Sequence, residues 1–292
     1  RLWPHNQPVS TETGELHSCW DDHEVQNTYS GGDPDGGDAD YSAIPVGIPQ
    51  FPPFQYSVKR RDAAYRAFFQ SMPTFTIGRQ RLYHKATFGR HVDLFVLDER
   101  QYRSVASRRF LGADQSEFLR SGLTQSSASW KVIANAVMIM GGGGSDSWEG
   151  FPAEREALLG VISQNEVQDV VFITGDMHAC IAGDVQNAAE HTVATEFVCG
   201  SMTTPSTPEG WALIGRPGYG TADNPTMPQA EYDALNRPYY EELDFFSHGY
   251  VLCEAGAQTF KATYKKLETV RRESTALKAS NSYTLHRGTP GL

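Results

Sequence analysis

Carboxylate and imidazole side chains stand close together just after an apolar run of this chain. Asp176 and His178 lie one residue apart behind VVFIT (170–174). The run predicts a strand, and open α/β sheets assemble their sites at the carboxyl ends of strands. Gly175 permits a sharp turn there. Carboxylate and imidazole are ligands of iron, manganese and zinc, so the segment predicts a metal site. The structural alternative is a helix capped by Asp176 with a packed His178.

A second acidic-histidine cluster, WDDHE (20–24), lies far upstream. Charged groups are almost never buried without partners, so the cluster predicts either an exposed loop or a partly buried site. One of its carboxylates would complete a metal site begun by Asp176 and His178. His23 would then face the substrate as a proton donor or as a positive partner of an oxyanion.

Two arginines in LDERQYR (97–103) are candidate substrate ligands. A guanidinium group binds phosphate through two parallel hydrogen bonds, and Arg100 and Arg103 are predicted to do so. The alternative is a local ion pair with the neighbouring Asp98 and Glu99.

Length and charge narrow the class of protein. The chain has 292 residues, of which 39% are hydrophobic, and its net charge is −10. The negative charge argues against a nucleic-acid backbone or an anionic membrane as main partner. No apolar run approaches the ~20 residues that span a bilayer, and no signal peptide is visible. Arg1 in place of Met predicts a processed or truncated chain. The four cysteines form no CxxC pair and are expected to be buried free thiols.

Helical and strand patterns alternate along the chain. Helices are expected at 60–72, at 114–124 with Asp114 as N-cap, and from Pro152. Strands are expected at 130–140, 170–174 and 193–200, and the segment 81–100, with the apolar run 94–97, predicts a hairpin or paired strands. An irregular region follows at about 203–240, and then a closing antiparallel pair at 248–256 and 259–270. This order predicts a mixed α/β sandwich in a single domain.

Six segments in this order resemble one family, the alkaline phosphatase D (PhoD-like) metallophosphoesterases. They are WDDHEVQN, FGRHVDLFVLDERQYR, WKVIANAVM, SDSWEGFPAERE, VVFITGDMH and EFVCGSMTTPS, and the resemblance covers roughly positions 17 to 265. It implies a calcineurin-like metallophosphoesterase sandwich, mixed β-sheets flanked by helices, that hydrolyses phosphate esters at a site holding iron and calcium. It also implies export, to an extracellular or periplasmic location.

The resemblance assigns roles to five residues. Asp22 matches an acidic ligand that bridges toward the second metal, where relatives carry Asn. His23 matches the histidine that meets the phosphate and protonates the leaving alkoxide. Asp176 and His178 match the last ligand motif, and Asn27 matches part of an Asn-Asn pair.

The chain departs from the family pattern at several places. Thr28 stands where Asn is usual, Ala136 where the family commonly has Gln, and Glu149 where Asp is more usual. The family's earlier motifs, a cysteine-bearing strand end and a Gly-Asp-x-x-Tyr segment, are not found. The expectation is therefore one PhoD-like domain, 1–292, that lacks its N-terminal part and carries about half of a metal centre.

Two functions from different classes follow. The first is metal-dependent hydrolysis of small-molecule or lipid phosphate esters, as a phosphomonoesterase or phosphodiesterase, with iron and calcium, or manganese or zinc, as metals. The second is a non-catalytic remnant that binds a ligand or a partner protein. A serine hydrolase lacks its G-x-S-x-G elbow here. A glycosidase would give no reason for His23 and His178.

Overall fold

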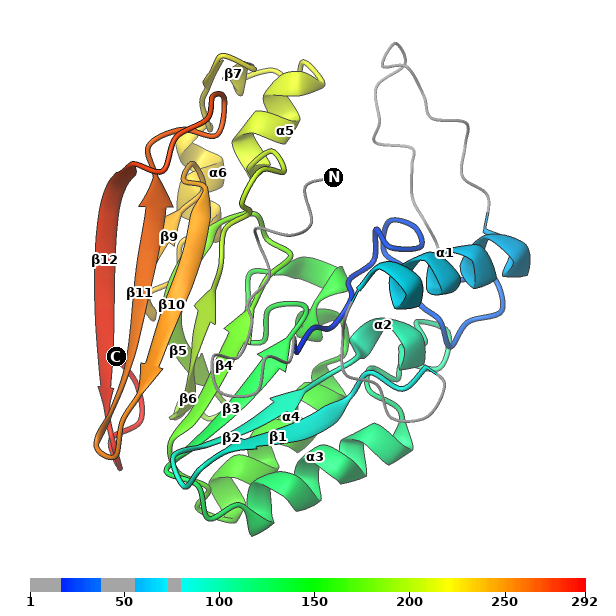
Figure 1. Ribbon diagram of the computed structural model, residues 1–292, viewed down its shortest axis with the longest axis vertical. Helices are drawn as coiled ribbons and strands as arrows, with labels where there is room; N and C mark the ends of the chain where they lie inside the picture. The colour runs from blue at the N-terminus through cyan, green and yellow to red at the C-terminus, as the bar shows by residue number, and fades with distance from the viewer. Residues whose placement is uncertain (1–16, 38–55, 73–79) are drawn as a thin grey trace.

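The computed structural model describes residues 17–37, 56–72 and 80–292. Two β-sheets lie face to face, and helices pack on the outer face of the larger sheet (Figure 1). The larger sheet has the strand order β1-β2-β3-β4-β6-β5-β9, and the smaller sheet has the order β10-β11-β12. A short ribbon pairs β7 with β8.

The strands are β1 (His84–Phe88), β2 (Val92–Val96), β3 (Trp130–Asn135), β4 (Val170–Thr174), β5 (Cys180–Gln186), β6 (Thr192–Val198), β7 (Gly220–Thr221), β8 (Asn224–Pro225), β9 (Tyr240–Asp244), β10 (Gly249–Ala255), β11 (Thr259–Leu267) and β12 (Leu277–His286). The helices are α1 (Val58–Ser71), α2 (Glu99–Tyr102), α3 (Ala113–Gln125), α4 (Pro152–Gln164), α5 (Thr207–Leu213) and α6 (Gln229–Leu235). Two 3-10 turns, η2 (Gly144–Asp146) and η3 (Trp148–Gly150), follow the glycine run.

The centre of the larger sheet is parallel. Strands β2, β3, β4 and β6 run in one direction. Parallel strands are covered on both faces and therefore read as continuous apolar runs, the pattern of β3 and β4. Leu119 of α3 and Leu159 of α4 pack with Phe172 on one face. Phe197 and Phe260 pack between the two sheets on the other. The carboxyl ends of these strands meet at one edge, where sites of such sheets form.

Most predicted elements are present. The mixed α/β sandwich is confirmed, and the predicted helix at 60–72 is α1, whose C-cap is Met72. The strand at 170–174 is β4, and β1 and β2 form the expected antiparallel pair. The closing pair is β10 and β11, which β12 extends.

The strand predicted over 130–140 ends at Asn135. The side chain of Asn135 donates to the carbonyl of Val137, and the backbone then leaves the sheet. The buried carboxylate of Glu196 accepts the N–H groups of Ile139 and Met140, at 3.1 and 2.8 Å. A side chain from β6 thus replaces the neighbouring strand as the partner of these donors, which an apolar pattern does not reveal.

Two local predictions are wrong. Helix α3 begins at Ala113 with Gly112 as N-cap, so Asp114 lies in the first turn and does not cap it. The irregular region at 203–240 contains the short helices α5 and α6.

Among the described residues, no helix is long and apolar enough to cross a bilayer. The four cysteines are free, as expected, but only Cys180 is fully buried and Cys253 is exposed.

Candidate metal centre

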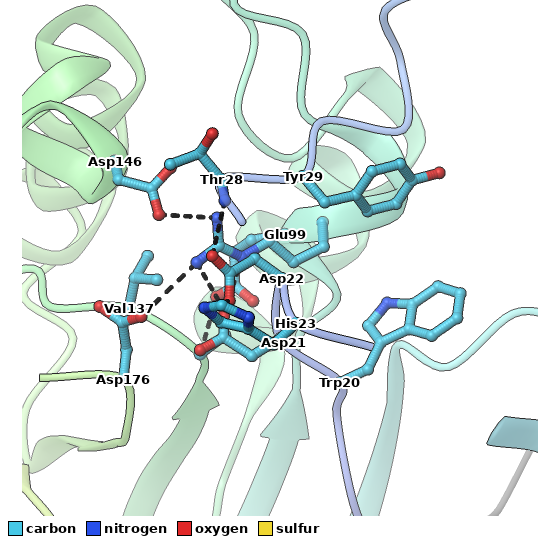
Figure 2. Close-up of polar contacts among 12 residues, drawn as sticks. Trp20, Asp21, Asp22, His23, Thr28, Tyr29, Glu99, Val137, Asp146 and Asp176 are labelled. Carbon is cyan, nitrogen blue, oxygen red and sulfur yellow. Dashed lines mark hydrogen bonds and ion pairs between the residues drawn. The ribbon is translucent and has the colours of Figure 1, made fainter. Parts of the chain in front are cut away.

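Three carboxylates meet at the carboxyl end of β4. Asp21, Asp22 and Asp176 each place a carboxylate oxygen within 4.8 Å of the others. In Figure 2, Asp146 and Asp176 approach from one side, and the turn that carries Asp21 to His23 approaches from the other. The two acidic clusters, far apart in the sequence, therefore converge in space.

The upstream turn is anchored by its aromatic residue. The buried Trp20 ring lies 4.3 Å from the ring of Tyr65 in α1, and its Nε1 donates to Asp98 Oδ1 at 2.8 Å. Trp20 points away from the carboxylates (Figure 2). Asp22 closes the turn, because its Oδ2 accepts the Thr28 N–H at 2.6 Å. These contacts fix the backbone that presents Asp21 and Asp22.

The loop after β4 has an unusual backbone. Asp176 and His178 both have positive φ, 66° and 50°. This region is unfavourable for residues other than glycine, although Asp and His visit it more often than most. His178 Nδ1 lies 2.7 Å from the carbonyl oxygen of Pro205. A carbonyl only accepts, so Nδ1 donates, and in the neutral ring Nε2 keeps its lone pair for a metal or a proton.

A buried arginine links the carboxylates. Arg100 is fully buried. Its Nε donates to Asp21 Oδ1 at 2.6 Å, and Nη1 donates to Asp146 Oδ2 at 2.8 Å. Nη2 lies 3.7 Å from Asp176 Oδ1. Arg100 therefore pairs with carboxylates from distant segments rather than with its sequence neighbours.

Arg103 holds the same assembly from a second direction. Its Nη1 lies 2.7 Å from Asp146 Oδ1, its Nε donates to Ser30, and its Nη2 donates to the carbonyl of Tyr29 at 2.9 Å. Its alternative pairing with Asp98 and Glu99 is not what the contacts show. The guanidinium groups of Arg100 and Arg103 both donate hydrogen bonds to protein groups. The phosphate contact predicted for them stays a prediction.

The electrostatics of the cluster favour a cation. The site contains four carboxylates, which are the three of the cluster and that of Asp146, and two guanidinium groups. When all six groups are ionised, the site has an excess of two negative charges. Burial, then the nearby Asp21, raises the pKa of Asp176 to about 8. Burial also raises the pKa of Asp21, against the opposing effect of Arg100. Without a cation, a proton on Asp176 relieves the excess. Carboxylate oxygens are hard ligands, and a divalent ion would take the place of that proton.

This raised pKa predicts how stability depends on pH. The folded pKa of Asp176, about 8, lies above the ordinary value of 3.8 for an aspartate, so between these values the folded protein binds more protons than the unfolded chain. The contribution is fully present below about pH 4 and is lost as pH rises through about 8. In urea unfolding with chelator, the slope from one such group is at most about 1.4 kcal/mol per pH unit. Asp176→Asn should flatten the curve between pH 5 and 8; an unchanged slope would contradict the shift.

A second buried carboxyl lies beside the cluster. Glu99 is fully buried, and burial raises its pKa to about 8. Its Oε1 accepts the Ala136 N–H at 3.3 Å, whereas Oε2 has no hydrogen-bond partner in the described part of the chain. The adjacent Ala136 offers no side-chain ligand atom.

The remaining predicted residues lie at the edge of the site. His23 has 79% of its side chain exposed, and its Nε2 lies 3.9 Å from Asp22 Oδ1. Asn27 is half-buried in the same turn. Glu149, the family departure in WEGFP, accepts the N–H groups of Gly142 and Gly144 and so fixes the glycine run.

Sequence reasoning missed two participants. Asp21 was not assigned as a ligand, although its adjacency to Asp22 was a usable signal. Asp146 pairs with both Arg100 and Arg103 across the site, and nothing in its local sequence indicates this role.

A cavity of about 750 Å³ opens beside the cluster. Gly175, the neighbour of Asp176, lines it together with Asn135 and Thr174 from the ends of β3 and β4. The wall formed by the smaller sheet includes Tyr250 and Val251 of β10. An organic group of moderate size fits such a space.

Comparison with known proteins identifies the family. The model of the PhoD-like phosphatase family matches residues 11–264. The chain belongs to this family. Alkaline phosphatase D of Bacillus subtilis (strain 168) is 28% identical over 309 residues, which cover 94% of this chain and 48% of that protein. The solved structure of PhoD matches with a TM-score of 0.66 and 26% identity, over 92% of this chain and 52% of that one. The chain thus spans about half the length of these PhoD-like relatives.

Proposed function

We propose that this chain forms part of a metal-dependent hydrolase of phosphate esters, with its metal held at Asp21, Asp22 and Asp176. The observation that carries the proposal is the convergence of three carboxylates, two of them near the buried guanidinium group of Arg100, at the carboxyl end of a parallel strand. Membership of the PhoD-like phosphatase family supports the same chemistry.

The donor set suits a metal ion. When bound, an ion would lower the pKa of a water ligand and neutralise charge on the phosphoryl oxygens. Asp22 and Asp176 offer oxygen ligands, and the orientation of His178 leaves its Nε2 lone pair for a borderline metal. We propose iron and calcium from the family resemblance, with manganese or zinc as alternatives. Asn27 is a further proposed ligand.

The protein's own groups carry the remaining tasks. His23 is exposed next to Asp22, so it can reach a leaving oxygen and donate a proton to it. Arg100 and Arg103 hold the carboxylates in place from the buried side. We also propose that these guanidinium groups bias the site toward anionic substrates, because Arg100 pairs with Asp21 of the cluster and both arginines pair with Asp146.

The cavity indicates the substrate class. Ile173, Phe197, Met202 and Val251 give it an apolar wall next to the acidic cluster. An ester with an organic group, either a small molecule or a lipid, would place that group there and its phosphate at the carboxylates. We propose an extracellular or periplasmic location from the same resemblance.

The test measures hydrolysis and metal content together. The protein is stripped with chelator and assayed on a chromogenic phosphate monoester and a chromogenic diester. Activity should vanish and return when iron and calcium, manganese or zinc are restored, and the restoring ion identifies the metal. Full activity in the stripped protein, with no metal found by elemental analysis, would refute the proposal.

A binding protein without turnover is the second candidate function. It is favoured by Ala136, which is buried beside the site and supplies no ligand where the family commonly has Gln. This candidate predicts that the metal-loaded protein hydrolyses neither ester, although calorimetry still detects binding of a phosphate-ester analogue.

A further inference from the structure

The strained loop at Asp176–His178 is held by a segment that follows β6. The carbonyl of Pro205 accepts from His178 Nδ1 at 2.7 Å. The hydroxyl of Thr207, at the start of α5, donates to the carbonyl of Met177 at 2.9 Å. Asp176 and His178 both have positive φ, which is unfavourable for residues other than glycine, so the loop conformation needs support from its surroundings. These two hydrogen bonds supply such support at Met177 and at His178.

That segment, 201–209, is in turn fixed by a buried histidine. His248 lies just before β10, and its Nε2 is 2.8 Å from Glu209 Oε2. The same carboxylate oxygen accepts the Ser206 N–H at 2.9 Å. On the other side of the ring, Nδ1 lies 3.2 Å from Ser201 Oγ. His248 therefore clamps both ends of the segment that carries Pro205.

We propose that Thr207, Glu209 and His248 are positioning residues that set the orientation and tautomer of His178 and the place of Asp176. The inference rests on the proposed function, since it concerns the same metal centre. The contacts run from His248 through Glu209 to the 201–209 segment, and from Pro205 and Thr207 to the loop. Partners that orient a metal ligand typically change metal affinity by about 10–100-fold when removed.

The same atoms superficially match a Ser-His-acid nucleophile. Ser201, His248 and Glu209 stand in the right order. The Ser201 hydroxyl, however, donates to the carbonyl of Thr204 and so closes its own turn. Its single hydrogen is directed away from the imidazole, which a nucleophilic serine would need as base. This geometry fits a clamp.

The decisive variant is Thr207→Val, which keeps the shape of the side chain and removes its hydroxyl. Thr207→Ser, which keeps the hydroxyl, is the matched control. We expect Thr207→Val to weaken binding of Mn²⁺ by about 10-fold and Thr207→Ser to stay within about twofold. Long-range ¹H–¹⁵N NMR of the metal-free protein should show His178 as the Nδ1–H tautomer in the wild type and in Thr207→Ser, and a mixture in Thr207→Val.

A second pair tests the clamp. His248→Leu removes both ring contacts, whereas His248→Gln keeps a donor for Glu209. His178 should lose its tautomer preference in the first variant and retain most of it in the second. A folded Thr207→Val protein with the wild-type His178 tautomer and Mn²⁺ affinity would overturn the inference. If the tautomer shifts but the wild type binds no metal, the positioning role stands and the proposed function fails.

Discussion

Arg100→Met is expected to lower the free energy of unfolding by about 3–5 kcal/mol, the cost typical of removing one partner from a buried ion pair. The side chain is fully buried and pairs directly with Asp21 and Asp146. Its loss leaves these carboxylates, and the nearby Asp176, in a poorly solvated site with less positive charge. Urea unfolding in the presence of chelator measures the effect.

The control for this prediction is an arginine with an exposed partner. Arg120 pairs with Glu117 on α3, and both side chains are 56% exposed. Arg120→Met should change the free energy of unfolding by less than about 1 kcal/mol. A double variant, Arg100→Met with Asp21→Asn, should recover part of the loss, because it removes one of the unpaired carboxylates. Equal, small effects at Arg100 and Arg120 would show that the cluster is better solvated than its burial indicates.

The parts of the site that the sequence predicted are those with a local signature. Asp176 and His178 stand directly after an apolar run, and the strand that this run forms delivers them to the sheet edge. Asp22 and His23 are conspicuous because a run of charged groups resists burial. In both places, a few consecutive residues carry the information.

The parts that the sequence did not predict depend on contacts between distant segments. The local alternative for Arg100 is an ion pair with Asp98 or Glu99, but its partners are Asp21 and Asp146, which the fold brings from distant segments. The early end of β3 also depends on a contact between distant segments. The apolar pattern predicts a strand that continues past Asn135, but the N–H groups of Ile139 and Met140 donate to Glu196 of β6 and not to a neighbouring strand.

The hydrogen bond from His178 Nδ1 to the carbonyl of Pro205 also cannot be predicted from the sequence, because every residue type has a backbone carbonyl. A long-range hydrogen bond to a main-chain atom depends on where the chain runs and hardly at all on which side chains it carries. The orientation of a histidine ligand is therefore predicted less well than its presence.

Asp176→Asn is expected to separate metal affinity from stability, with opposite signs. The amide keeps the shape of the carboxylate and tolerates the positive φ of 66°. It removes a charged ligand, so the affinity for a divalent ion and the metal-dependent kcat/KM should each fall by at least about 100-fold, more than is typical of residues that only support a ligand. In the metal-free protein, the same change relieves repulsion with Asp21, so stability at pH 8 should rise.

Asp114→Asn is the matched control, since Asp114 is exposed on α3 and remote from the cluster in sequence. It should leave metal affinity and kcat/KM unchanged and lower the free energy of unfolding by less than about 1 kcal/mol, because Asp114 lies in the first turn of α3. Calorimetric titration with Ca²⁺ and Mn²⁺, together with urea unfolding in chelator at pH 8, gives both quantities on one preparation. A plain structural role for Asp176 would lower stability and affinity together. Opposite movements follow only if this carboxylate is held close to other negative charges so that a cation can bind among them.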